Sequence, residues 1–326
     1  MVAARQQKPA WAGEEILSRW VNRLIQIKPL YGLMKWQARR VMIRTAETQG
    51  IPWREICTQL ETSAIQAQLA DLTNPTVTYP DYYQVPFHAY DAGNLCWQAA
   101  FEATPATYAI ALRIWPKEKL TWQAAQDRLR GQFYQALSDY LNGTPQNTPK
   151  GIRSVQDILD VGCSVGVSTR WLHHFFQQQQ TVHTTGLDLS PYMLAVAQHL
   201  DTKRAVSQWI HAPAEQTGLP DASFDLVTLQ FVTHELPRSA TIAIVQEIRR
   251  LLRPGGTLAI ADNNPQSAVL QNLPPVLFTL MKSTEPWSDD YYTFDIEAAL
   301  RELGFQHVFS QATDPRHRGI FAQKEC

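Results

Sequence analysis

The segment Ile158-Leu-Asp-Val-Gly-Cys-Ser-Val-Gly166 decides the fold of this chain. An apolar run leads into Asp160-Val-Gly162, and a helical pattern begins near Val167, directly after Gly166. Glycine lets the backbone turn sharply and lets a ligand approach it closely. In open parallel sheets, ligands bind where the strands end. The segment therefore predicts a strand, a ligand-binding turn and a helix, in that order.

Short apolar runs alternate with helical stretches on both sides of this segment. The pattern predicts strands at 155–161, 182–188, 206–211, 224–230 and 256–262, helices at 165–178, 190–200, 239–252 and 294–303, and final strands at 305–311 and 317–323. Such alternation indicates a parallel sheet with helices on both faces. We expect an α/β fold, a Rossmann-like doubly wound sheet that ends in an antiparallel hairpin.

The first half of the chain has a different texture. Its periodicity predicts helices at 12–28, 31–48, 53–72, 95–115 and 121–141, with Pro29 ending the first of them. Residues 73–93 are aperiodic and rich in aromatic residues, and residues 142–151 form a polar linker. We therefore predict a helical region at 1–148 that caps the substrate, followed by a cofactor-binding domain at 149–326.

Composition excludes several classes of protein. The net charge is -1, yet residues 1–60 hold ten basic and four acidic residues, a local charge of +6. None of the four cysteines forms a CxxC pair, so we expect no metal site and a reduced protein. There is no signal-peptide pattern and no apolar run of about 18 residues. The sequence favours a cytoplasmic protein, with peripheral membrane contact through Arg19, Arg23, Arg39 and Arg40 as an alternative to a solvated helix face.

The glycine turn does not suit a dinucleotide. A G-x-G-x-x-G pattern would need glycine where Ser164 and Val167 stand. Asp160 would repel a pyrophosphate, whereas it suits a cationic ligand. Asp188, at the end of the second predicted strand, is placed to accept hydrogen bonds from ribose hydroxyls. These residues indicate a positively charged nucleoside ligand.

With these residues in place, the chain resembles the class I S-adenosylmethionine-dependent methyltransferases. The resemblance is carried by Leu159–Gly166, Gly186–Ala197, Ala214–Val227 and Leu251–Leu258, in family order and spacing. Ser164 replaces the usual middle glycine, and Pro213 stands where many members have an adenine-binding aspartate. Residues 82–97 also resemble a stretch of uncharacterised methyltransferases from cyanobacteria and plant plastids.

The resemblance implies S-adenosylmethionine as cofactor and a set of residues that hold it. That set is Asp160, Gly162, Cys163, Ser164, Gly166, Asp188, Leu189, Ala214, Glu215 and Gln230. For Asp160, an alternative is a structural anchor of the loop. Two histidines are candidate catalytic residues, His234 after the fourth predicted strand and His88 in the aromatic stretch. Packing roles for both remain open.

Methyl transfer mainly needs alignment of donor and acceptor in a dry cavity, so no further constellation is required. We expect a small aromatic or isoprenoid-type acceptor, methylated at oxygen or carbon, beneath the aromatic stretch. The alternatives are a protein or RNA methyltransferase and a non-catalytic binding protein of the same fold. Nucleic acid is the less favoured partner, because the basic residues form no recognisable binding module. The sequence does not indicate an oligomeric state.

Overall fold

The computed structural model describes residues 28–88, 90–143, 151–274 and 284–325. They form one seven-stranded sheet with the strand order β3-β2-β1-β4-β5-β7-β6. The strands are β1 (Asp157–Val161), β2 (His183–Asp188), β3 (Gln208–His211), β4 (Phe224–Gln230), β5 (Leu252–Asn263), β6 (Phe305–Ala312) and β7 (His317–Lys324). The first five are parallel, and β7 pairs antiparallel with both β5 and β6. The predicted doubly wound sheet with its antiparallel ending is confirmed.

Helices cover both faces of this sheet. They are α6 (Trp122–Asn142), α7 (Val167–Gln177), α8 (Pro191–Leu200), α9 (Arg238–Leu251), α10 (Ala268–Gln271), α12 (Ser288–Tyr292) and α13 (Ile296–Glu302). Adjacent strand residues face opposite ways. Ile158 packs with α6 and α7, while Leu159 packs with α9, α12 and α13. Because both faces are covered, the strands are apolar throughout.

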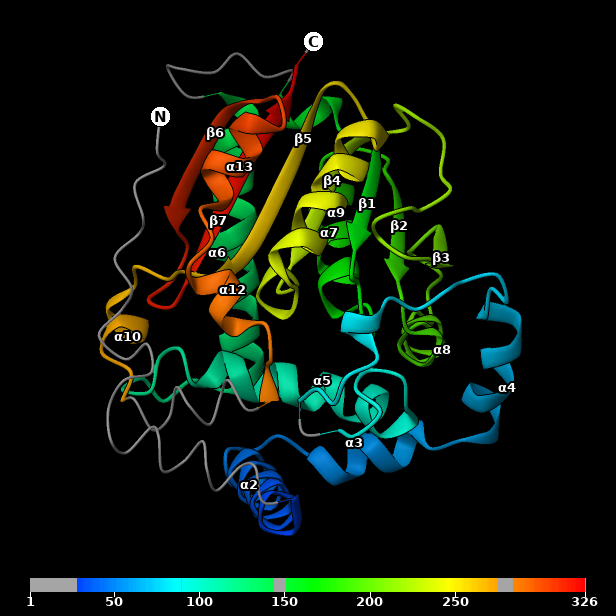
Figure 1. The fold of residues 1–326 in the computed structure, drawn as a ribbon, viewed down its shortest axis with the longest axis vertical. Coiled ribbons are helices and arrows are strands. Elements are labelled where there is room, and N and C mark those ends of the chain that lie inside the picture. The colour runs from blue at the N-terminus through cyan, green and yellow to red at the C-terminus, as the bar shows by residue number, and fades with distance from the viewer. Residues whose placement is uncertain (1–27, 89, 144–150, 275–283, 326) are drawn as a thin grey trace.

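In the described residues before α6, the α-helices are α2 (Lys28–Thr48), α3 (Trp53–Leu60), α4 (Ser63–Leu72) and α5 (Trp97–Leu112). In Figure 1 the arrowheads of β1 and β2 point toward this helical region. Leu60 and Ile65 pack with α5, the start of α7 and α8 in one buried cluster. The helical region therefore lies at the carboxyl edge of the sheet, where a ligand is expected.

One prediction for this region is wrong in detail. The expected helix 53–72 is broken into α3 and α4, because the Thr62 side chain accepts a hydrogen bond from the Ile65 N–H and so caps a new helix. The end of the predicted helix 12–28 stays a prediction, because residues 1–27 lie outside the described residues, but Pro29 itself is helical. Pro29 lies in the first turn of α2. Backbone N–H groups in the first turn have no acceptor within the helix, so proline costs no hydrogen bond there. The predicted helix 12–28 and most of the linker 142–151 lie outside the described residues.

The division at residue 148 stays a prediction, but α6 contributes directly to the sheet's packing. Phe133 and Tyr140 both stack on Phe321 of β7, with ring centroids 5.9 and 5.3 Å apart. Leu137 between them is fully buried. The last helix before the linker is thus part of the same hydrophobic core as the strands.

Candidate active site

The glycine loop, residues 162–166, turns the chain from β1 into α7. Gly162, Ser164 and Gly166 all have left-handed backbones, with φ of 69°, 50° and 71°. The N–H groups of Gly162 and Cys163 both donate to the Leu187 carbonyl, at 2.8 and 3.0 Å. Left-handed backbone at serine costs about 1 kcal/mol more than at glycine. The loop keeps its turn despite Ser164.

Asp188, at the end of β2, holds the glycine loop in place through hydrogen bonds to its carboxylate. One carboxylate oxygen accepts from the Ser164 N–H at 2.7 Å, and the other accepts from the Ser190 N–H at 2.8 Å. Burial raises the pKa of Asp188 to about 6, although these hydrogen bonds oppose the rise. Ser190 in turn caps α8 by accepting from the Met193 N–H. The carboxylate therefore ties β2, the glycine loop and α8 together at the edge where strands end.

Asp160 lies beneath the loop and is 1% exposed. Its carboxylate accepts hydrogen bonds from the side chains of Thr169, Thr228 and Gln230. Gln230 completes the network by accepting from the Tyr134 hydroxyl of α6 at 3.2 Å. Burial raises the pKa of Asp160 in spite of the three donors. This geometry favours the anchoring role over direct ligand contact for Asp160 and Gln230.

Glu215 lies past the end of β3, on the side where the resemblance places adenine. The Tyr82 hydroxyl donates to one of its carboxylate oxygens. The other oxygen, Oε2, is buried and has no hydrogen-bond partner in the described part of the chain. A buried acceptor without a partner is costly and is normally matched by a ligand or water. Glu215 Oε2 is therefore an unsatisfied acceptor among the described residues, at a position with almost no accessible surface.

The remaining predicted cofactor residues surround these carboxylates. Leu189 is buried, and its carbonyl accepts from the His211 ring at 3.1 Å. Ala214 packs against the main core. Cys163 is buried, and desolvation raises the pKa of its thiol well above the usual value. An uncharged, buried thiol is unreactive, so Cys163 can serve a ligand only through its backbone.

His234 forms a buried pair with Asp262 at the ends of β4 and β5. Its Nδ1 lies 2.7 Å from one Asp262 oxygen, and its backbone N–H donates to the other at 3.1 Å. Burial lowers the pKa of His234, but the charge and hydrogen bond of Asp262, helped by Glu285 and Glu235, outweigh it and raise that pKa to about 10. At neutral pH this imidazole is a cationic donor, and Nε2 is the nitrogen left to face an acceptor.

His88 and two glutamates complete this side of the site. His88 Nε2 lies 3.7 Å from Glu235 and 3.9 Å from Glu285. Burial and the neighbouring carboxylates, opposed by the charge of His234, raise the pKa of Glu235 to about 8. The structure thus brings the two candidate histidines to one place. A glutamate whose pKa lies near neutrality is suited to move protons.

Three acidic residues of this site, Glu235, Asp262 and Glu285, were not predicted from the sequence. Glu235 is adjacent to His234, and Asp262 is a polar residue ending a buried strand, so both had a local signal. Glu285 had none, because only tertiary packing brings it to the histidines. Among the described residues no group of three or more His, Cys, Asp or Glu side chains is arranged to hold a metal ion.

An aromatic strap, residues 74–88 and 90–97, crosses the carboxyl edge of the sheet. At one end the Asn74 N–H donates to His211 at 2.9 Å. In its middle Tyr82 reaches Glu215. Toward its other end the Tyr90 hydroxyl donates to Glu102 of α5 at 2.6 Å, and the Asn94 carbonyl accepts from the Ser190 hydroxyl. The strap closes over the same carboxylates that surround the glycine loop.

Comparisons with known proteins agree with this geometry. Residues 159–260 match a family described as a methyltransferase domain. The chain is 30% identical over 133 residues to a sterol 24-C-methyltransferase of Neurospora crassa, covering 40% of this chain and 33% of that protein. It is 32% identical over 107 residues to the 2-methyl-6-phytyl-1,4-hydroquinone methyltransferase of Synechocystis sp., covering 33% and 32%. A demethylmenaquinone methyltransferase of Tropheryma whipplei is 27% identical over 174 residues, covering 48% and 70%.

The matched residues run from β1 to β5 and include the glycine loop and Asp188. This part of the chain is similar to a methyltransferase domain, and the match supports the resemblance to the class I S-adenosylmethionine-dependent methyltransferases and the cofactor predicted from the motifs. The chain covers about a third of the length of the first two relatives. In the part of the chain that the structure describes, no helix is both long and apolar enough to span a bilayer.

Replacing Gly166 with alanine should destabilise the protein. A Cβ at this left-handed position would come within 2.4 Å of the Trp209 ring. The backbone strain and the clash together predict a loss of about 2 to 5 kcal/mol in the free energy of unfolding. Gly131→Ala is the matched control, because Gly131 lies in helix α6 with nothing near its Cβ position. Urea denaturation should show Gly131→Ala unchanged or up to about 1 kcal/mol more stable. Equal losses in the two variants would contradict this account.

Proposed function

We propose that the protein transfers a methyl group from S-adenosylmethionine to a small, apolar acceptor that carries a ring or isoprenoid hydroxyl. The observation that carries the proposal is the pairing, at one sheet edge, of a nucleoside-type site with a partly buried proton-transfer cluster. The glycine loop and Asp188 form the first part, and His234, Glu235 and Asp262 form the second. The aromatic strap covers both.

The residues present fit the cofactor. In the proposed arrangement, Asp188 accepts from the ribose hydroxyls, and Glu215 Oε2 gains the donor that it lacks. The backbone of the glycine loop, at Gly162, Cys163, Ser164 and Gly166, together with Leu189 and Ala214, lines the rest. Carboxylates around the site favour a ligand with a net positive charge. When bound, S-adenosylmethionine supplies a methyl group on a positively charged sulfur.

The histidine and the glutamate act on the acceptor. His234, charged and held by Asp262, donates a hydrogen bond from Nε2 to the acceptor's oxygen. Glu235 in its ionised form takes the proton that the acceptor loses as its oxygen or carbon bonds the methyl carbon. The His234 charge then partly stabilises the electron-rich acceptor before transfer.

The names of three relatives support an apolar acceptor. By their names, these relatives methylate a sterol, a phytyl hydroquinone and demethylmenaquinone, which are all ring compounds. The strap offers Tyr79 and Tyr83 as a stacked pair, with ring centroids 6.4 Å apart, at the strand ends. Aromatic walls with a few polar groups are typical of sites for small apolar molecules. Whether oxygen or carbon receives the methyl group depends on which atom of the acceptor His234 and Glu235 hold toward the methyl carbon.

Labelled S-adenosylmethionine tests the function directly. The full-length protein is incubated with methyl-labelled cofactor and a cell extract, which is then divided into solvent-extractable small molecules, protein and RNA. We expect label in the solvent-extractable fraction. Label in protein or RNA would replace the proposal by one of those alternatives. Calorimetric absence of cofactor binding, together with no label, would identify a non-catalytic protein of this fold.

Glu235→Gln should lower the rate constant kcat by about 100-fold or more, because the proton acceptor is lost. In the native protein, activity should rise with pH through about 8, as Glu235 loses its proton. The glutamine variant should lose this rise while keeping its affinity for S-adenosylmethionine. Glu302→Gln, at an exposed position of α13, is the control and should match the native pH profile. An unchanged profile in Glu235→Gln would remove the residue from the mechanism.

Asp188 should make cofactor affinity dependent on acid pH. The carboxylate must be ionised to accept from Ser164, Ser190 and the ribose at once, and its pKa is about 6. Calorimetric affinity for S-adenosylmethionine should therefore fall as the pH drops through about 6. Asp188→Asn should bind about 10- to 100-fold more weakly at neutral pH and lose this dependence. Asp139→Asn, an exposed change on α6, should keep both. A native-like pH dependence in Asp188→Asn would exclude this role.

A further inference from the structure

His211, at the end of β3, is a buried histidine whose ring joins two parts of the molecule. On one side its Nδ1 lies 2.9 Å from the backbone nitrogen of Asn74, the first residue of the aromatic strap. On the other side its Nε2 lies 3.1 Å from the carbonyl oxygen of Leu189. Leu189 is the middle residue of the β2 turn, residues 188–190. The ring therefore stands between the strap and the β2 turn.

These two contacts fix the protonation state of the ring. The Asn74 N–H can only donate, so Nδ1 accepts its hydrogen bond and carries no proton. A neutral ring then has its proton on Nε2, which donates to the Leu189 carbonyl. Burial lowers the pKa of His211, although the hydrogen bond to Leu189 opposes this change, so the neutral form is favoured. The ring thus accepts from the strap and donates to the β2 turn.

The carbonyl that His211 binds belongs to the same peptide group as an N–H that Asp188 binds. The Leu189 carbonyl and the Ser190 N–H share one planar unit. Among the described residues no peptide bond is cis, so these two groups point in opposite directions. The Ser190 N–H donates to one Asp188 oxygen at 2.8 Å, and the other oxygen accepts from Ser164 at 2.7 Å. A continuous chain of hydrogen bonds therefore runs from the strap through His211 to Asp188 and the glycine loop.

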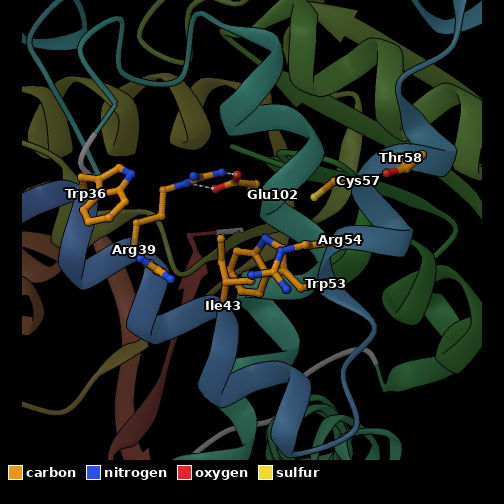
Figure 2. Close-up of a pocket in the computed structure, with 9 residues that line it drawn as sticks. Trp36, Arg39, Ile43, Trp53, Arg54, Cys57, Thr58 and Glu102 are labelled. Atoms are coloured by element: carbon orange, nitrogen blue, oxygen red, sulfur yellow. Dashed lines mark hydrogen bonds and ion pairs between the residues drawn. The ribbon is translucent and has the colours of Figure 1, made fainter.

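The other end of the strap reaches the same turn. The Asn94 carbonyl accepts from the Ser190 hydroxyl at 2.7 Å. Close by in the sequence, the Tyr90 hydroxyl donates to Glu102 of α5, and Figure 2 shows that this carboxylate is also paired with Arg39 of α2. The strap is thus held to the helical region and, at both of its ends, to the β2 turn.

We propose that His211 is a positioning residue that couples the aromatic strap to the carboxylate of Asp188. The inference rests on the proposed function, in which Asp188 accepts from the ribose hydroxyls of the cofactor. With the strap in place, His211 holds the Leu189–Ser190 peptide group so that its N–H faces Asp188, and the carboxylate keeps one orientation. Because coupling between two sites is reciprocal, a bound cofactor holds the strap more firmly in turn.

Substitutions of His211 separate the two hydrogen bonds of its ring. His211→Asn places an acceptor oxygen near the position of Nδ1 but has no donor that reaches Leu189. His211→Gln places an amide N–H near the position of Nε2 but leaves the Asn74 N–H without its acceptor. His211→Phe keeps a ring and removes both hydrogen bonds. His183→Phe, at an exposed position where β2 begins, is the matched control.

Calorimetry with S-adenosylmethionine measures the effect on the cofactor site. Loss of the hydrogen bond to the Leu189 carbonyl should weaken binding by about 3- to 10-fold in His211→Asn and His211→Phe. His211→Gln keeps that hydrogen bond and should bind within about twofold of the native protein. The control should bind like the native protein. Thermal unfolding of each variant shows whether it is folded.

Hydrogen–deuterium exchange of residues 73–83, followed by mass spectrometry, measures the effect on the strap. Without cofactor, this segment should exchange faster in His211→Gln and His211→Phe, which lack the acceptor for Asn74, and at the native rate in His211→Asn. Saturating S-adenosylmethionine should slow its exchange by a larger factor in the native protein and the control than in any His211 variant. Exchange in α9 should be the same in all of them.

The two measurements together decide the matter. Weaker cofactor binding by His211→Asn than by His211→Gln, with a smaller cofactor effect on strap exchange in both, would support the coupling. Native affinity in folded His211→Phe, or a native cofactor effect on its strap, would overturn the inference and leave the proposed function standing. If His211→Phe does not fold, equal affinities of His211→Asn and His211→Gln would overturn it. Absence of cofactor binding by the native protein would overturn both.

Discussion

One carboxylate, that of Asp188, holds the site together. It accepts one backbone N–H from the glycine loop and one from the start of α8, so that two turns far apart in the sequence share a single anchor. Backbone N–H groups in a turn or at the start of a helix have no acceptor within that turn or helix. A buried carboxylate satisfies both without taking a cation into the core. The left-handed conformation of Ser164 depends on this anchor, because nothing in its side chain favours that backbone.

Three of the six non-glycine residues with left-handed backbone in the described part of the chain lie around the same edge. Besides Ser164, the left-handed residues His88 and Phe231, with φ of 48° and 61°, adjoin the strand ends. Each is held from several sides, since the His88 N–H donates to the Thr284 carbonyl and the Phe231 N–H donates to the Ala261 carbonyl. Such conformations persist only where surrounding contacts determine them, and they gather at functional sites. Their position is consistent with chemistry at the ends of β4 and β5.

Local pattern was enough to predict the strands, the glycine loop and Asp188, because strand ends and turns are encoded by neighbouring residues. It could not show that Asp160 turns inward, since Tyr134 and its network come from a distant helix. The meeting of His88 with Glu285 is likewise a product of tertiary packing. The break at Thr62 was readable as a cap, but the apolar periodicity on both sides concealed it.

The packing of α6 has a consequence for the order in which the chain can fold. Phe133 and Tyr140 stack on Phe321, and nearly the whole sheet lies between these residues in the sequence. During synthesis the apolar face of α6 is therefore made long before the strand that covers it. Segment β1 and helix α7, which follow α6 closely in the chain, can cover part of that face early, but the part around Phe133 and Tyr140 lacks its final cover until β7 inserts between β5 and β6. Contacts between residues so distant in the sequence slow folding and leave intermediates with exposed apolar surface, which tend to aggregate. We therefore expect folding of this protein to depend on chaperones.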